Sequence, residues 1–191
     1  MILSNTEIIK CIKSKKIGIS PLDQFSDPQR SPFNTSAIDL RLGNEIRVPR
    51  TDGPTQLDLS KPGIADYLRT NSDKFTLSDS QPYSLKRNIF VLGNTLEVVN
   101  FPLSKGKVGY SARVEGKSSI ARCGILVHFT APTIHAGFEG TIALEIINLG
   151  PKEFLLKPGM YICQLIIEEV KGKLASAPNQ FVGQRTPSGH K

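Results

Sequence analysis

Short apolar runs separated by turn residues constrain the fold of this chain more than any other feature of its sequence. Nearly all of them are about four to ten residues long, the usual length of β-strands, and Gly, Pro, Asn or Ser bounds them. The runs lie at residues 75–77, 83–85, 89–92, 95–99, 107–114, 125–130, 141–147, 153–156 and 161–170. Strands at this spacing predict a mainly β barrel or sandwich and disfavour a doubly wound α/β fold. The run at 141–147 alternates only in part, so we expect that strand to be covered on both faces.

The first residues predict a short helix. Ser4 followed three residues later by Glu7 forms a capping box, in which each side chain satisfies a backbone N–H at the start of the helix. The apolar positions that would pack this helix onto the domain edge are Leu3, Ile8, Ile9 and Ile12. Gly18 would end the helix, and residues 37–43 then alternate apolar and polar side chains, as a half-buried strand does.

Composition excludes several classes of protein. With 39% hydrophobic residues the chain can bury a sizeable core, so we expect one domain over residues 1–191. It lacks a run of about 18 uncharged apolar residues, which excludes a membrane helix, and its amino end does not resemble a secretory leader. We therefore expect a cytoplasmic protein without a membrane partner. Cys11, Cys123 and Cys163 are too widely spaced for a disulfide framework or a metal motif.

The net charge of +7 favours a polyanionic partner, either nucleic acid, anionic lipid or a nucleoside triphosphate. Zinc-finger spacing and ribonucleoprotein aromatic motifs are both missing, so the charge alone is weak evidence for nucleic acid. Residues 171–191 contain no acid and are rich in Pro, Gly, Ser and Gln. Such a segment is either a frayed tail or a mobile segment that orders over an anionic ligand.

A polar turn at residues 116–119 is a candidate phosphate site. Its sequence, Gly-Lys-Ser-Ser, offers backbone N–H groups, two hydroxyls and an ammonium, and Arg122 shares their face if the turn is helical. These groups suit phosphate oxygens. The turn is not a P-loop, because that motif needs a glycine where this chain has Ser111. On spacing alone, an ordinary polar turn remains the alternative.

Glu145 interrupts the otherwise apolar run 142–147. A carboxylate in such a strand costs free energy unless it is paired or has a chemical role. Burial would raise its pKa toward the range of a general base that works near neutral pH. The alternative is a structural ion pair with an arginine.

Several separated motifs follow one another along nearly the whole chain. They are Met1-Ile2-Leu3-Ser4, Ile38-Asp39-Leu40-Arg41-Leu42-Gly43, Gly116-Lys117-Ser118-Ser119-Ile120-Ala121-Arg122, His128-Phe129-Thr130-Ala131, Ile134-His135-Ala136-Gly137-Phe138-Glu139-Gly140, Leu144-Glu145, Pro158-Gly159-Met160 with Gln164, and Gly183-Gln184-Arg185. In this order and spacing they resemble the trimeric dCTP deaminases of the dUTPase-like superfamily.

The resemblance implies a dUTPase-like β-barrel or β-clip with a short N-terminal helix and a mobile tail, residues 171–191, that closes over the site. It also implies a homotrimer with active sites at subunit interfaces. The implied reaction is hydrolytic deamination of dCTP to dUTP and ammonia, a step of pyrimidine deoxynucleotide biosynthesis. Magnesium would arrive on the triphosphate rather than on protein ligands. Zinc is not expected, because the His-x-Glu and Pro-Cys-x-x-Cys motifs of zinc deaminases are missing from the sequence.

The resemblance also assigns roles to individual residues. Glu145 would be the general base for the water that attacks C4, and Ser118 and Arg122 would help to hold that water. The other implied nucleotide-binding residues are Lys117 and Ser119 toward the phosphates, Ile120 and Ala121 in the same motif, Ala131 at the pyrimidine, Ala143 and Leu144 beside the base, His135 at the sugar, and Gln164 and Gln184 toward the nucleotide.

The chain departs from the family pattern in the sugar contact and in the tail. His135 stands where the family usually has Asp, and an imidazole can bond the 3′-hydroxyl but has no fixed negative charge. Gln180 and Phe181 replace a Lys-Tyr pair, and a Tyr further upstream has no counterpart. Three hypotheses remain: a deaminase that releases dUTP, a bifunctional deaminase and diphosphatase that releases dUMP, and a nucleotide-binding homologue with weak catalysis. Lys117 and residues 183–185 favour the second.

Overall fold

The computed structural model describes residues 1–22, 27–53, 56–60, 62–103, 108–177 and 181–189. Its strands are β1 (Gly18–Ser20), β2 (Phe33–Asn34), β3 (Ala37–Arg41), β4 (Glu45–Pro49), β5 (Ser72–Thr76), β6 (Tyr83–Leu85), β7 (Phe90–Asn100), β8 (Gly109–Gly116), β9 (Ile125–Val127), β10 (Thr133–Ile134), β11 (Glu139–Asn148), β12 (Phe154–Leu156) and β13 (Tyr161–Val170). Its helices are α1 (Asn5–Lys13), α2 (Ile64–Thr70) and α3 (Ser118–Ala121). The prediction of a mainly β fold with a short N-terminal helix is confirmed.

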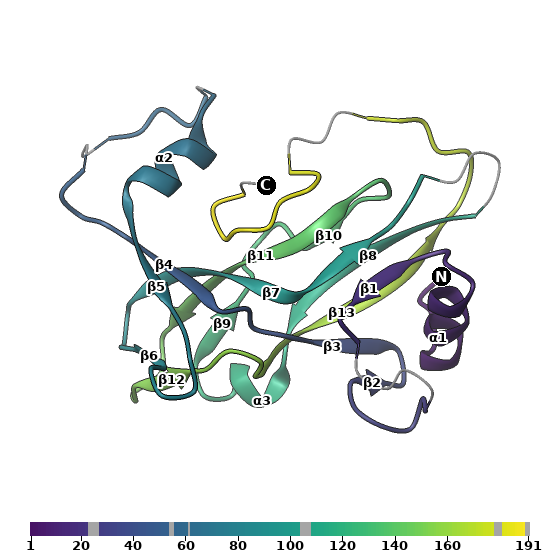
Figure 1. Cartoon of the computed structure of the whole chain (residues 1–191), viewed down its shortest axis with the longest axis horizontal. Coiled ribbons are helices and arrows are strands. Elements are labelled where there is room, and N and C mark those ends of the chain that lie inside the picture. The colour runs from purple at the N-terminus through teal and green to yellow at the C-terminus, as the bar shows by residue number, and fades with distance from the viewer. Residues whose placement is uncertain (23–26, 54–55, 61, 104–107, 178–180, 190–191) are drawn as a thin grey trace.

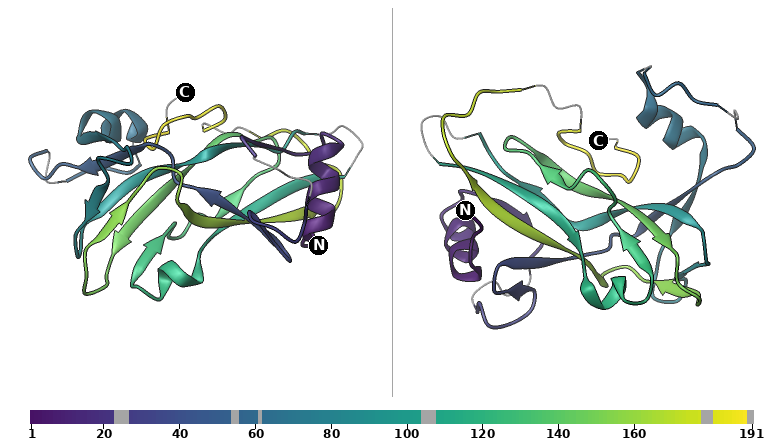
Figure 2. Two further views of the ribbon diagram at one scale, coloured as in Figure 1. Left: turned by 60° about the horizontal axis from the view of Figure 1, so that its bottom comes forward. Right: turned by 180° about the vertical axis from the view of Figure 1, so that it is seen from behind.

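Two antiparallel sheets form the body of the molecule (Figure 1). One follows the order β5-β4-β7-β11-β9, with β1 also paired to β7, and the other follows the order β10-β8-β13-β3-β2. Strands β6 and β12 form a separate ribbon. Helix α1 and helix α2 lie at opposite ends of the two sheets (Figures 1 and 2). Among the described residues, none of the helices is both long and apolar enough to cross a membrane.

The facing sides of the two sheets supply the core. On β11 the buried side chains are Ile142, Leu144 and Ile146, and on β13 they include Leu165 and Ile167. Each series takes every second position, which is the period that places side chains on one face of a strand. The period-2 pattern of the sequence therefore reports which face of each sheet is buried.

The second face of β11 is less covered than we expected from its apolar sequence. Ala143, Glu145 and Ile147 point away from the core and are only half-buried within the single chain. A bulge between Thr141 and Ala143 interrupts the pairing of β11 with β7, and the hydroxyl of Thr95 accepts the hydrogen bond of the Ile142 N–H at 2.9 Å. This bulge ends two residues before Glu145, and a bulge bends the strand that carries it.

The predicted N-terminal helix is confirmed, but its predicted end is wrong. The Ser4 hydroxyl accepts a hydrogen bond from the Glu7 N–H at 3.4 Å, as the capping pattern indicated. The helix ends at Lys13 rather than at Gly18. The hydroxyl of Ser14 donates a hydrogen bond to the carbonyl of Lys10 in the last turn. Lys15 then takes a left-handed backbone conformation, with φ of 57°, which ends the helix.

Most predicted strands are present with shifted ends. The runs 89–92 and 95–99 form the single strand β7. Gly93, which lies between them, has no side chain, and the side chains of Leu42 and Ile146 fill the space beside it. The run 125–130 ends at Val127, since the next residue has φ of 67° and leaves the strand. Lys107, at the start of another predicted run, lies outside the described residues.

Helix α2 was not predicted from the sequence, and side chains from outside the helix fix its end. Arg47 donates to the carbonyl of Arg69 at 3.1 Å, and Arg50 donates to the carbonyl of Thr70 at 3.2 Å. Because the last carbonyls of a helix lack partners within it, these bonds tie the end of α2 to strand β4 and to the residue that follows it. The helix thereby lies beside the C-terminal segment (Figure 1).

A buried ion pair joins the two sheets. The side chain of Glu97 on β7 is 2% exposed, and its carboxylate lies 2.7 Å from the Nε of Arg41 on β3. The backbone N–H of Arg41 also donates to Glu97, at 2.8 Å, and the guanidinium donates to the carbonyl of Pro21 at 3.0 Å. Two donors of Arg41, its backbone N–H and its Nε, therefore replace the water that would otherwise hydrogen-bond the buried carboxylate of Glu97.

Candidate active site

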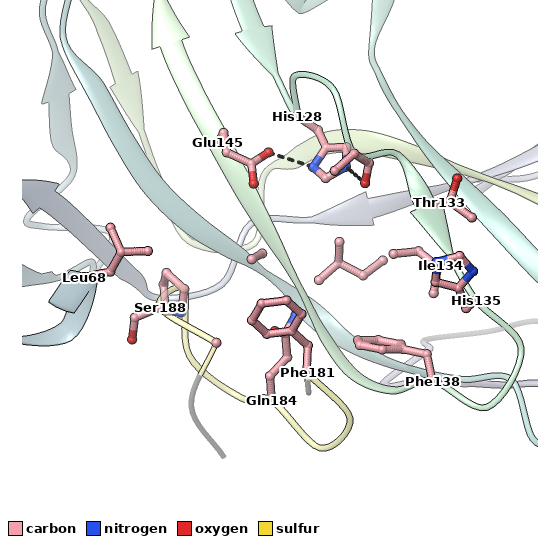
Figure 3. A pocket seen from close by; sticks show the side chains of 15 residues that line it. Leu68, His128, Thr133, Ile134, His135, Phe138, Glu145, Phe181, Gln184 and Ser188 are labelled. Carbon is pink, nitrogen blue, oxygen red and sulfur yellow. Dashed lines mark hydrogen bonds and ion pairs between the residues drawn. The ribbon is translucent and has the colours of Figure 1, made fainter. Parts of the chain in front are cut away.

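A cavity of about 320 Å³ opens on the outer side of β11 (Figure 3). Four separate parts of the chain form its walls: β11 itself, the segment 128–138, the tail segment 181–189 and one side chain of α2. The lining residues are Leu68, His128, Ala131, Thr133, Ile134, His135, Phe138, Ile142, Ala143, Glu145, Phe181, Gln184, Pro187, Ser188 and Gly189. Its size and mostly apolar walls with few polar groups are typical of a small-molecule site.

Glu145 and His128 meet at one end of this cavity. The Oε2 atom of Glu145 lies 3.0 Å from Nδ1 of His128, and the Nε2 of the same ring lies 2.9 Å from the carbonyl oxygen of Ala131. The His128 side chain is 6% exposed, while that of Glu145 is 31% exposed. Figure 3 shows the second oxygen of Glu145 directed into the cavity. One carboxylate oxygen is therefore held by the protein, and the other is available to a ligand.

The charges of this pair stabilise each other. Burial acts against the charged form of both groups, but the contact and charge attraction between them outweigh it, so the pKa of His128 is raised and that of Glu145 is lowered. Burial thus acts on Glu145 in the expected direction, but the net shift of its pKa is downward because of His128, not toward neutral pH as we expected. The alternative was a structural ion pair between Glu145 and an arginine, but the partner of Glu145 is a histidine, His128.

The backbone at His128 explains how the ring reaches Glu145. Its φ of 67° turns the chain out of β9, and its N–H still donates to the carbonyl of Glu145 at 2.8 Å. Left-handed backbone is uncommon at residues other than Gly, although His, Asn and Asp adopt it more readily than most, and it marks a position that the surrounding structure holds in place. The two residues are thus joined twice, through the backbone and through their side chains.

The tail docks on the start of β11 mainly through its backbone. The N–H of Gly183 donates to the carbonyl of Glu139 at 2.6 Å, and the N–H of Thr141 donates to the carbonyl of Gln184 at 3.0 Å. The side-chain amide of Gln184 adds a bond to the carbonyl of Thr141 at 2.8 Å. Residues 181–189 thereby form one wall of the cavity (Figure 3). Gln180 lies outside the described residues.

The structure brings together only part of the residues that the sequence indicated. Those that line the cavity are Ala131, His135, Ala143, Glu145 and Gln184. Leu144 points into the core and is fully buried. The remaining residues, Lys117, Ser118, Ser119, Ile120, Ala121, Arg122 and Gln164, do not line this cavity. Ser118, Ser119 and Arg122 are instead exposed on and beside α3.

Lys117 and Gln164 share a different partner, Asp39 on β3. The ammonium of Lys117 contacts one oxygen of this carboxylate, and the amide of Gln164 donates to the other at 3.1 Å. Asn34 also donates to the second oxygen, at 2.9 Å. Asp39 was noted in the sequence only as part of a motif. In the structure it holds Lys117 at the start of α3.

His128 and Leu68 are among the lining residues to which the sequence assigned no role. His128 stood within the His-Phe-Thr-Ala motif, which was a usable signal, but only the fold shows that its ring faces Glu145. Leu68 had no signal at all, because the helix that carries it was not predicted. Within the part of the chain that the structure describes, no group of three or more His, Cys, Asp or Glu side chains is arranged to hold a metal ion.

Comparison with known proteins bears on this site. A family model described as dCTP deaminase-like matches residues 2–170. The chain is 37% identical over 165 residues to the "dCTP deaminase, dUMP-forming" of Dictyoglomus turgidum, covering 86% of this chain and 78% of that protein. It is 36% identical over 182 residues to the "dCTP deaminase" of Actinobacillus succinogenes, covering 94% of this chain and 89% of that protein.

A solved structure shows a similar fold. It is the crystal structure of a 2′-deoxycytidine 5′-triphosphate deaminase from Agrobacterium tumefaciens, with a TM-score of 0.64 at 22% identity. The match covers 87% of this chain and 47% of that one, so this chain spans about half of its length. This solved structure therefore shares the mainly β architecture described above.

Proposed function

The chain belongs to the dCTP deaminase-like family, and we propose that it hydrolyses the 4-amino group of dCTP, releasing dUTP and ammonia. The observation that carries the proposal is the placement of Glu145. Among the described residues that line the cavity it is the one carboxylate, and it directs one oxygen into the cavity (Figure 3). A positioned carboxylate of this kind can move the protons that the reaction requires.

In the proposed mechanism Glu145 is the general base. Water adds to C4 of cytosine while one of its protons passes to Glu145, which delivers that proton to the ring nitrogen N3. The second water proton then passes through Glu145 to the 4-amino group. The C4–N bond breaks, ammonia leaves and the C4 carbonyl of dUTP forms. Glu145 ends each cycle ionised, so a low pKa keeps it ready for the next water.

We propose that the site is shared between subunits of a homotrimer. Ser118 and Arg122, which the family resemblance places at the water, lie outside the cavity that contains Glu145 of the same chain. The exposed groups of α3 would therefore act in a neighbouring subunit's cavity. A cyclic arrangement allows each chain to supply both parts, one to each of two sites.

Apolar side chains on the Glu145 face of the sheet support such an interface. Leu126 of β9 pairs with Ile147 of β11, which in turn pairs with Phe90 of β7. Leu126 and Phe129 are 45% and 42% exposed, and the Phe129 ring lies 5.8 Å from that of Phe90. Contiguous exposed apolar residues beside a site are typical of surfaces that another chain covers.

Mixing two inactive variants tests the shared site. Glu145→Gln removes one half of each site, and the double variant Ser118→Ala/Arg122→Ala removes the other. If neighbouring chains share sites, equal mixing with subunit exchange restores both halves in about one site in four. We expect turnover of the mixture to exceed the sum of the separate variants several-fold. A mixture that only equals that sum contradicts the shared site.

We propose dUTP rather than dUMP as the product. Hydrolysis at the α-phosphate needs a second group to activate water, and the cavity wall of this chain offers an imidazole, His135, where the family resemblance has a carboxylate. Magnesium enters bound to the triphosphate, whose oxygens and waters are its preferred ligands.

One assay distinguishes the candidate functions. The protein is incubated with dCTP and magnesium, and the nucleotides are separated by chromatography. We expect dUTP and ammonia in equal amounts. The name of the Dictyoglomus turgidum relative favours dUMP as a second candidate product. Accumulation of dUMP would establish that bifunctional activity, and binding of dCTP without turnover would establish a nucleotide-binding homologue.

A further inference from the structure

The hydrogen-bonding groups around His128 determine where its protons lie. The carbonyl of Ala131 can only accept, so Nε2, at 2.9 Å from it, carries a proton. The other nitrogen, Nδ1, faces Glu145 Oε2 at 3.0 Å. Both atoms are buried and, within the described residues, no aligned hydrogen-bond partner reaches either one. If neither Nδ1 nor Oε2 carried a proton, the lone pair of Nδ1 would face the carboxylate oxygen directly, without water to separate them. Such an arrangement costs free energy.

We infer that His128 is a positioning residue that holds a second proton, between Nδ1 and Glu145, in the resting site. The inference rests on the proposed function, because it assigns a task to the pair that would carry out deamination. An imidazolium at Nδ1 fixes Oε2, so that the other oxygen of Glu145 alone faces the attacking water (Figure 3). It also keeps the carboxylate ionised between cycles.

Other charged groups do not explain this arrangement. Of the described residues that line the cavity, His128, His135 and Glu145 are the ones that carry an imidazole or carboxyl group. On β7, the residue paired with Glu145 is the apolar Leu92. His128 thus faces one opposite charge, and its pKa is raised although burial acts in the other direction.

If His128 holds this proton, kcat/KM should fall at both acid and alkaline pH. Because the pKa of Glu145 is lowered, the carboxylate loses its charge only at a pH below its ordinary range. Because the pKa of His128 is raised, the imidazolium persists above its ordinary range and is lost as the pH rises further. We therefore expect kcat/KM to stay level through neutral pH, to fall on the acid side with Glu145, and to fall on the alkaline side with His128.

The variant His128→Asn tests whether His128 acts on Glu145 through its positive charge or only through a hydrogen bond. Asparagine tolerates the left-handed backbone at this position, and its amide can donate to Glu145 near the place of Nδ1, but it does not titrate. We expect this variant to lose the alkaline limb and to move the acid limb upward by about one pH unit or more. His135→Asn is the matched control, since it changes a second histidine of the same cavity and should leave the acid limb in place. An acid limb unmoved by His128→Asn overturns the inference.

An NMR titration provides a readout that needs no turnover. The chain has three histidines, and the two variants above assign their ring signals. We expect the His128 signals of the full chain to report a ring protonated at both nitrogens at neutral pH, and Glu145→Gln to lower its midpoint. A singly protonated ring, or a midpoint unchanged by Glu145→Gln, overturns the inference. If the proton is found as expected but dCTP is not converted, the proposed function fails while the assignment of the proton stands.

Discussion

We expect the Glu145→Gln protein to deaminate dCTP at least about a hundredfold more slowly than the unchanged protein. Glutamine keeps the size of the side chain and can still fill the space beside His128. It cannot accept the proton of the attacking water, nor pass protons to N3 and to the leaving amine. The loss should therefore appear in kcat, because the group acts on the reacting atoms rather than on the bound nucleotide alone.

Steady-state deamination with dCTP and magnesium measures this effect, and a binding titration with dCTP shows whether the cavity survives. We expect affinity within a few-fold of the unchanged protein, since the other cavity walls are intact. Glu153→Gln is the matched control, because Glu153 bonds only the exposed hydroxyl of Ser84 among its described contacts and lies on the loop before β12. Near-normal turnover by Glu145→Gln would remove the general-base assignment.

The second large effect concerns stability. We expect Arg41→Met to lower the free energy of unfolding by about 3–5 kcal/mol, because it leaves the carboxylate of Glu97 buried without its cation. Methionine keeps much of the apolar stem of the arginine, so the loss reflects the unpaired charge rather than a large cavity. Urea unfolding at one fixed protein concentration measures the change, since subunit association would also contribute.

Arg113→Met is the matched control for that variant. Arg113 also pairs with a glutamate across two strands, Glu168, at 2.8 Å, but the two side chains are 40% and 30% exposed. Water screens such a pair, so its loss should cost no more than about 1 kcal/mol. Equal destabilisation by the two variants would contradict the view that burial of Glu97 makes its pairing essential.

The sequence predicted the strands well because their apolar period depends on local pattern. Residues 83–85 and 161–170 became strands with the predicted bounds. Helix α2 escaped prediction since bonds from Arg47 and Arg50, which lie outside it, hold its end in place. Local propensity gives no information about such support.

The candidate site was harder to predict, because its contacts depend on strand register. Lys117 and Gln164, which the family resemblance placed toward the nucleotide, both contact Asp39, because the pairing of β13 with β3 places Gln164 beside it. The contact of His128 with Glu145 follows from the turn that ends β9, and no spacing rule foretells that turn. Glu145, which the family resemblance implied as the general base, lines the cavity, and its partner His128 became apparent only in the folded chain.

The way the tail docks has a consequence for how this protein can diverge. The tail is held to β11 by the backbone of Gly183 and Gln184, by the side-chain amide of Gln184 and by the ion pair of Arg185 with Glu139, and the side chains of Phe181 and Ser188 line the cavity. Much of this attachment comes from backbone atoms and from Arg185, while Gln184 serves both the attachment and the cavity wall. Substitutions at Phe181 or Ser188 can alter which nucleotide is accepted while the segment stays docked. Ligand preference can thus evolve in the tail without rebuilding the sheet beneath it.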